Sequence, residues 1–158
     1  MAWLKTNDLK NEEPVDKKKS ILAVDFDGTI VENDYPNLGK PNPGAIEVLR
    51  ELMGKGYRLI LLTMREGEPL QQAMVYCNGH NVDFFGVNEN PEQKDWAPDS
   101  RKVHASLYID DAGMNIPLRM GSNNKPCVDW VKLRDVFVSW NVLEEKEPGD
   151  GTETFEIK

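Results

Sequence analysis

The sequence predicts an α/β domain with a three-layer, Rossmann-like fold and a mostly parallel central sheet. Two observations lead to this fold class. Short apolar runs of strand length alternate along the chain with segments whose apolar residues recur at helical spacing. The runs are continuously apolar, as is typical of parallel strands that are covered on both faces. The length of 158 residues suits one domain with a sizeable core.

The first half of the chain predicts a strand, a helix and a second strand. SILAVD over 20–25 is a short apolar run of buried-strand length. A helix over 42–56 follows, in which Asn42 suits the N-cap and Pro43 the first helical position. YRLILLT over 57–63 is a second buried strand. This order is the start of a βαβ unit, which predicts parallel pairing of the two strands.

The second half repeats the alternation. The expected elements are a helix over 68–79, strands over 82–87 and 105–111, a short strand over 125–130, and a last helix whose apolar face carries Trp130, Leu133, Phe137 and Trp140.

Composition separates this domain from its two ends. Residues 1–19 are polar with mixed charge and 144–158 are acidic, so we expect a flexible N-terminal arm, a folded domain over 20–143 and an acidic C-terminal tail. The net charge of -8 argues against broad binding to nucleic acid. No apolar stretch approaches the roughly 20 residues of a membrane span. The chain starts without the apolar region of a signal peptide, so we expect no membrane contact and a cytoplasmic protein.

Polar residues follow several of the predicted strands. Asp25 and Asp27 come after the first strand, Thr63 ends the second, and Asp110 and Asp111 end a later one. Because ligands of open parallel sheets bind outside the carboxyl ends of the strands, we expect these residues to meet. Clustered carboxylates repel each other unless a cation lies among them. An all-oxygen ligand set without His or Cys favours Mg²⁺.

The same edge has the groups that a phosphate needs. Gly28 allows a sharp turn that aims backbone N–H groups at an anion. Thr63 offers a hydroxyl, and Lys102 lies shortly before a predicted strand. Carboxylate, metal, hydroxyl, ammonium and amides together are what phosphoryl transfer requires. A carboxylate can also attack phosphorus directly.

With these residues the chain resembles the haloacid dehalogenase (HAD) superfamily, whose members are mostly Mg²⁺-dependent phosphatases. The resemblance covers roughly residues 20–130, and its nearest form is the small capless hydrolases of bacterial or phage type. It implies an enzyme with a HAD-like domain that hydrolyses phosphomonoesters through an aspartyl-phosphate. The motifs that carry it are DFDGT at 25–29, Thr63 after LILL, Lys102, and YIDD at 108–111.

The resemblance also implies a role for each motif residue. Asp25 resembles the nucleophile and Asp27 the general acid/base. Mg²⁺ would be held by the side chains of Asp25 and Asp110 and by the main-chain carbonyl of Asp27. Asp111 would support the site, through a metal-bound water or by orienting Lys102. Phosphate would be bound by Thr63, Lys102 and the amides near Phe26, Asp27 and Met64.

The short spacing of the motifs leaves no room for a cap domain. We therefore expect an open cleft, which could accept a bulky or macromolecular phosphate. The substrate that we expect is a small phosphorylated molecule. A nucleotide or an oligonucleotide end is the alternative substrate, and a weakly active phosphate-binding protein is the alternative function. A homo-oligomer could supply a lid.

Two arginines and one loop leave alternatives open. Arg65 either contacts a second anionic group of the substrate or forms a surface ion pair. Arg101 is the alternative to Lys102 as the phosphate-binding cation. The polar loop over 87–100 either overhangs the cleft or is anchored on the body by Trp96.

Overall fold

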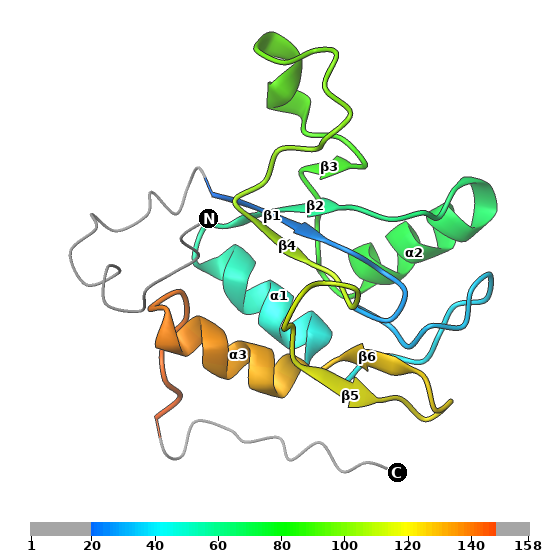
Figure 1. The fold of residues 1–158 in the computed structure, drawn as a ribbon, viewed down its shortest axis with the longest axis vertical. Coiled ribbons are helices and arrows are strands. Elements are labelled where there is room, and N and C mark those ends of the chain that lie inside the picture. The colour runs from blue at the N-terminus through cyan, green and yellow to red at the C-terminus, as the bar shows by residue number, and fades with distance from the viewer. Residues whose placement is uncertain (1–19, 148–158) are drawn as a thin grey trace.

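The computed structural model describes residues 20–147, which fold around a four-stranded parallel sheet (Figure 1). The predicted fold class is confirmed: the domain is a Rossmann-like, three-layer α/β fold, and within these residues no further domain is inserted. The strand order is β3-β2-β1-β4. The strands are β1 (Ile21–Val24), β2 (Arg58–Leu61), β3 (Gly86–Val87) and β4 (Leu107–Ile109).

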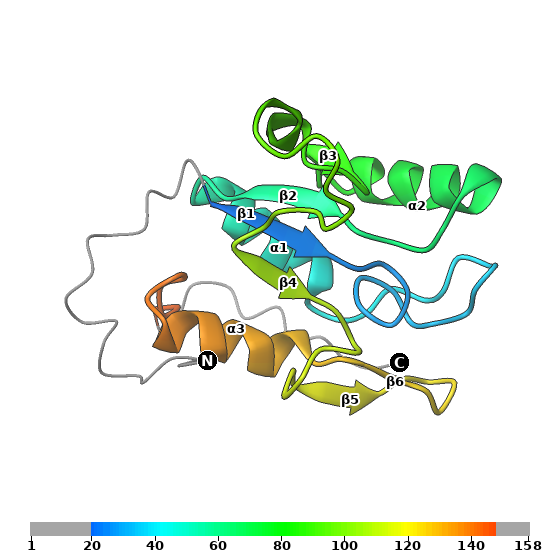
Figure 2. The ribbon, with the colours of Figure 1, turned by 45° about the horizontal axis from the view of Figure 1, so that its top comes forward.

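The described residues form three α-helices: α1 (Ala45–Gly54), α2 (Gly67–Gly79) and α3 (Trp130–Ser139). Their buried faces join alternate residues of the strands, such as Val24 and Leu61, in one hydrophobic core. Figures 1 and 2 both show α1 and α3 side by side. None of the helices in this part of the chain is long and apolar enough to cross a membrane.

The β3–β4 connection, residues 88–106, projects from the β3 edge of the sheet and contains the short helix η2 (Pro91–Asp95) (Figure 2). Two buried side chains link the two arms of this connection to each other: Asn90 donates to the carbonyl of His104, and Gln93 donates to the carbonyl of Lys102. Trp96 is 60% exposed, and its ring lies edge-on to that of His104, which belongs to the same connection. Both interpretations of the loop, an overhang of the cleft and an anchor at Trp96, stay predictions.

Asn42 does not cap α1, contrary to the prediction. The cap position is Gly44, with φ at 85°, and no side chain bonds to the first turn. Asn42 is buried instead, and its amide donates to the carbonyls of Thr29 and Val128, both at 2.8 Å. The residue satisfies backbone groups that lie 13 and 86 positions away in the chain, which local sequence does not reveal.

A second, two-stranded sheet was not expected. The predicted strand over 125–130 is β6 (Pro126–Val128), and it pairs antiparallel with β5 (Leu118–Met120), outside the central sheet. Leu118 and Met120 are both exposed. The segment therefore lacks the apolar pattern of a buried strand, which is why it was missed.

Residues 1–19 and 148–158, which contain the predicted arm and most of the predicted tail, lie outside the described residues. Leu143 is buried in the core. Beyond it, Glu144 pairs with Lys55 and Lys146 lies 3.4 Å from a carboxylate oxygen of Glu51, so the contacts with α1 continue for a few residues.

Candidate active site

Three aspartates meet at the carboxyl edge of the sheet. The parallel register pairs Val24 with Ile109, and the Asp25 N–H donates to the Ile109 carbonyl at 2.9 Å, so the residues that follow β1 and β4 are neighbours. One carboxylate oxygen from each of Asp25, Asp110 and Asp111 lies within 4.8 Å of the others. The structure thus brings these predicted residues together.

Thr29 orients two members of this cluster. Its hydroxyl donates to Asp25 Oδ2 at 3.1 Å and accepts the N–H of Asp111 at 3.2 Å. Thr29 is fully buried, and its carbonyl accepts from the indole of Trp130 at 2.7 Å. Sequence reasoning included Thr29 in the DFDGT motif but assigned it no role. The tertiary contacts show that it holds Asp25 in place.

Gly28 makes room for Asp111, and the turn that the sequence predicts there is confirmed. Its φ of +75° lies in the region that glycine adopts without steric cost. A Cβ at this position would lie 2.4 Å from Asp111 Oδ2. Any other residue at position 28 would therefore displace that carboxylate.

Asp27 takes a different partner. Its two carboxylate oxygens accept from Arg65 Nε at 2.7 Å and Arg65 Nη2 at 2.8 Å. Arg65 is 1% exposed, so its ion pair is present but buried rather than at the surface, and its side chain is not free to meet substrate. The proposed metal ligand at Asp27 is its main-chain carbonyl, and that role stays a prediction.

The structure places the other residues predicted to bind phosphate in different environments. Phe26 is fully buried, with its ring edge-on to Tyr76, so only its main-chain groups can face a ligand. Met64 follows Thr63, and its side chain is 96% exposed. The Thr63 hydroxyl accepts the Arg65 N–H at 3.1 Å, which stabilises the turn after β2.

Lys102 lies over the ring of Tyr108, in the strand that leads to Asp110 and Asp111. It is exposed, and its Nζ is 5.8 Å from the centroid of the Tyr108 ring. Within residues 20–147 no ion pair joins Lys102 or Arg101 to the three aspartates. The contact of Lys102, or of Arg101, with phosphate stays a prediction.

The cluster is electrostatically unfavourable without a cation. Burial, and then the charge of Asp110, raise the pKa of Asp25 to about 7. Burial, and then the hydrogen bond and charge of Asp110, raise the pKa of Asp111 to about 6. Three half-buried, mutually repelling carboxylates with only oxygen ligands fit Mg²⁺.

These shifts predict how the stability of the metal-free protein depends on pH. Between the ordinary Asp pKa and about 7, the folded state holds a proton on Asp25 that the unfolded state has lost, so stability falls as pH rises. From pH 5.5 to 8, we expect this carboxyl to lower the free energy of unfolding by about 2 kcal/mol. Urea unfolding in EDTA measures the effect.

Asp25→Asn should flatten this dependence, because it removes the titrating group, whereas the exposed control Asp83→Asn should keep it. An identical pH slope in wild type and Asp25→Asn would show that Asp25 titrates normally.

Comparison with known proteins finds that the chain is similar to a solved structure. No protein-family model and no curated protein matches it. The structure of a conserved protein, coded by a locus from Bacteroides thetaiotaomicron, is 36% identical, with a TM-score of 0.59; the match covers 74% of this chain and 88% of that one. The chain belongs to the same family as that protein. This family likeness supports the fold, and the chemistry rests on the residues of the site.

Proposed function

We propose that the chain is a Mg²⁺-dependent phosphomonoester hydrolase of the HAD type, acting through an aspartyl-phosphate on Asp25. The observation that carries the proposal is the meeting of Asp25, Asp110 and Asp111 at the carboxyl edge of the sheet, where Thr63 follows the end of β2 at Leu61. A buried threonine hydroxyl orients Asp25, as a nucleophile requires. The resemblance of the four motifs to the HAD superfamily supports the same reaction.

The metal would be held by the carboxylates of Asp25, Asp110 and Asp111, with the carbonyl of Asp27 as a further ligand. When bound, Mg²⁺ would neutralise these carboxylates and the charge on the transferred phosphoryl group. The raised pKa values of Asp25 and Asp111 support this assignment, because a bound cation favours their ionised forms.

Asp25 performs the first step of the proposed reaction. Its carboxylate oxygen attacks phosphorus, and the bond from phosphorus to the leaving oxygen breaks. Asp27, which for this step carries a proton on an oxygen lone pair that Arg65 does not use, gives that proton to the leaving oxygen. In the second step a water oxygen bonds to phosphorus, the bond between phosphorus and Asp25 breaks, and Asp27 takes the proton of the water. Thr63 and the N–H groups near Phe26 bind the phosphate oxygens.

The open surface around the site favours a second candidate substrate class, a nucleotide or an oligonucleotide end. Met64 and Met114 lie in the loops that follow β2 and β4, on the two sides of β1, and are 96% and 93% exposed. No domain inserted within the described residues covers this edge. A bulky leaving group could therefore approach Asp25.

Phosphate release from sugar phosphates, nucleotides and phosphorylated oligonucleotides, measured with Mg²⁺ and with EDTA, tests the function. We expect turnover of at least one class, lost on chelation. If no substrate of the panel releases phosphate although calorimetry shows that Mg²⁺ binds, the result would contradict a hydrolase and favour a phosphate-binding protein.

A further inference from the structure

We propose that Arg65 is a positioning residue that holds the Asp27 carboxylate and docks the flap, residues 33–39, onto the site. The part that concerns Asp27 rests on the proposed function. The flap is an excursion between β1 and α1. Its base is closed by the Glu32 N–H, which donates to the Lys40 carbonyl at 2.8 Å, and by a bridge between Val31 and Pro41.

The guanidinium of Arg65 joins three separate segments. Nε and Nη2 donate to the two oxygens of Asp27. Nη2 also donates to the Asn37 carbonyl at 2.6 Å, and Nη1 to the carbonyls of Pro69 at 3.1 Å and Pro36 at 3.4 Å. The five hydrogen bonds match the five N–H donors of an arginine side chain. One side chain thus links the site, the flap and the start of α2.

Aromatic rings complete the enclosure of this charge. The guanidinium carbon lies 4.9 Å from the Phe26 ring centroid and 5.5 Å from that of Tyr35 in the flap. Arg65 is 1% exposed, and a buried charge needs its partners because leaving it unpaired is costly. Asp27 and the flap carbonyls therefore depend on each other through Arg65.

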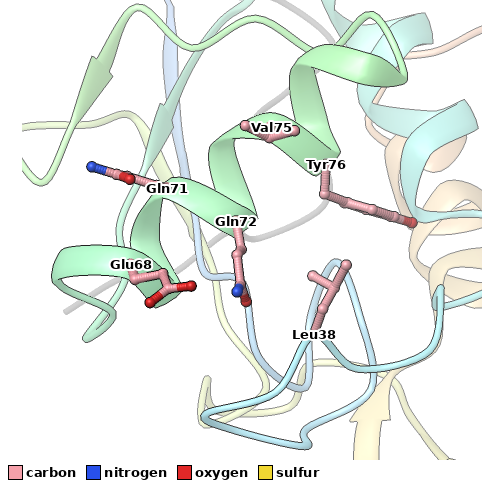
Figure 3. A pocket seen from close by; sticks show the side chains of 6 residues that line it. All are labelled: Leu38, Glu68, Gln71, Gln72, Val75 and Tyr76. Carbon is pink, nitrogen blue, oxygen red and sulfur yellow. The ribbon is translucent and has the colours of Figure 1, made fainter.

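Elsewhere the flap faces a groove. Figure 3 shows Leu38 of the flap opposite Gln72 and Tyr76 of α2, across a groove whose other lining residues are Glu68, Gln71 and Val75. Leu38 is 43% exposed and Val75 is 71% exposed. On this side the flap lacks tight packing against α2, so we infer that the Arg65 hydrogen bonds provide much of its attachment.

Arg65→Lys tests whether Arg65 positions Asp27 and the flap. Lysine keeps the positive charge but cannot form the bidentate hydrogen bond with the Asp27 carboxylate. Arg58→Lys is a matched control: Arg58 also donates to both oxygens of a carboxylate, Glu92, and lies over the Phe85 ring at 4.4 Å, but far from the cluster in the fold.

The first readout is the dependence of kcat/KM on the leaving group. An alkyl phosphate needs a proton from Asp27 on its leaving oxygen, whereas 4-nitrophenyl phosphate leaves readily without one. In Arg65→Lys we expect kcat/KM for the alkyl ester to fall about 100-fold, and that for the nitrophenyl ester less than about 10-fold. A structural defect alone would lower both equally. Arg58→Lys should retain both values.

The second readout does not need activity. Hydrogen exchange of the flap amides should become at least about 10-fold faster in Arg65→Lys than in Arg58→Lys. If Arg65→Lys does not fold, Asp27→Asn, which removes the charged partner of Arg65 and keeps its shape, should speed flap exchange in the same way.

A folded Arg65→Lys with wild-type flap exchange and an unchanged ratio of the two esters would overturn the inference. If the wild-type protein hydrolyses no phosphomonoester, the proposed function fails, and flap exchange still decides whether Arg65 docks the flap.

Discussion

Asp25→Asn is expected to abolish phosphate release, with kcat lowered by at least about 10³-fold. The amide oxygen of asparagine is a poor nucleophile and cannot form the aspartyl-phosphate. The substitution keeps the shape of the side chain, and the amide oxygen can still accept the hydrogen bond that Thr29 donates to Asp25 Oδ2. Phosphate release with Mg²⁺, on the best substrate of the panel, measures the loss.

The fold should survive this change. Because burial and the charge of Asp110 disfavour the ionised Asp25, the neutral amide should leave the metal-free protein at least as stable as wild type at pH 8. Asp83→Asn is the matched control, since Asp83 is exposed on the connection between α2 and β3 and should retain full activity. A folded Asp25→Asn with the wild-type rate would refute Asp25 as the nucleophile.

Asp110→Asn is expected to weaken Mg²⁺ binding by about 100-fold, because it removes one of the charged oxygen ligands. The local turn should persist, since the asparagine Oδ1 can still accept the Ala112 N–H that Asp110 accepts at 2.9 Å. Calorimetric titration with Mg²⁺, and the Mg²⁺ concentration that gives half-maximal thermal stabilisation, both measure the affinity.

Asp110→Asn should also change the pKa values of its neighbours, which a substitution far from the cluster should not do. Its charge raises the pKa values of Asp25 and Asp111, so Asp110→Asn should bring both closer to the ordinary Asp value and shift the pH dependence of metal-free stability to lower pH. Asp135→Asn, at an exposed position of α3, should change neither property. Wild-type Mg²⁺ affinity in Asp110→Asn would exclude Asp110 as a ligand.

The functional cluster was largely predictable because two simple rules combine. Continuous apolar runs that alternate with helices predict parallel strands, and parallel strands bring their carboxyl ends to one edge. Asp25, Asp110 and Asp111 stand at such ends in the sequence, and the register of β1 with β4 brings them together. The turn at Gly28 was predictable for a local reason, its need for a positive φ.

The partners of polar side chains were not predictable in this way. The sequence places Arg65 two residues after Thr63, but nothing local shows that it is buried against Asp27, 38 positions earlier in the chain. The same holds for Asn42, which looked like a helix cap and instead bonds to Val128. Lys102 belongs to a motif, but the course of residues 88–106 places it over Tyr108.

The sequence by itself therefore determined the fold class, the edge of the sheet where the site lies, and the aspartates that meet there. These follow from periodicity and from the topology of parallel strands, which depend on residues close together in the chain. Only the tertiary structure decided that Arg65 holds Asp27, that Thr29 orients Asp25, and where Lys102 lies. Such pairings depend on the paths of loops and on the burial of individual polar groups, which are set by contacts between distant parts of the chain.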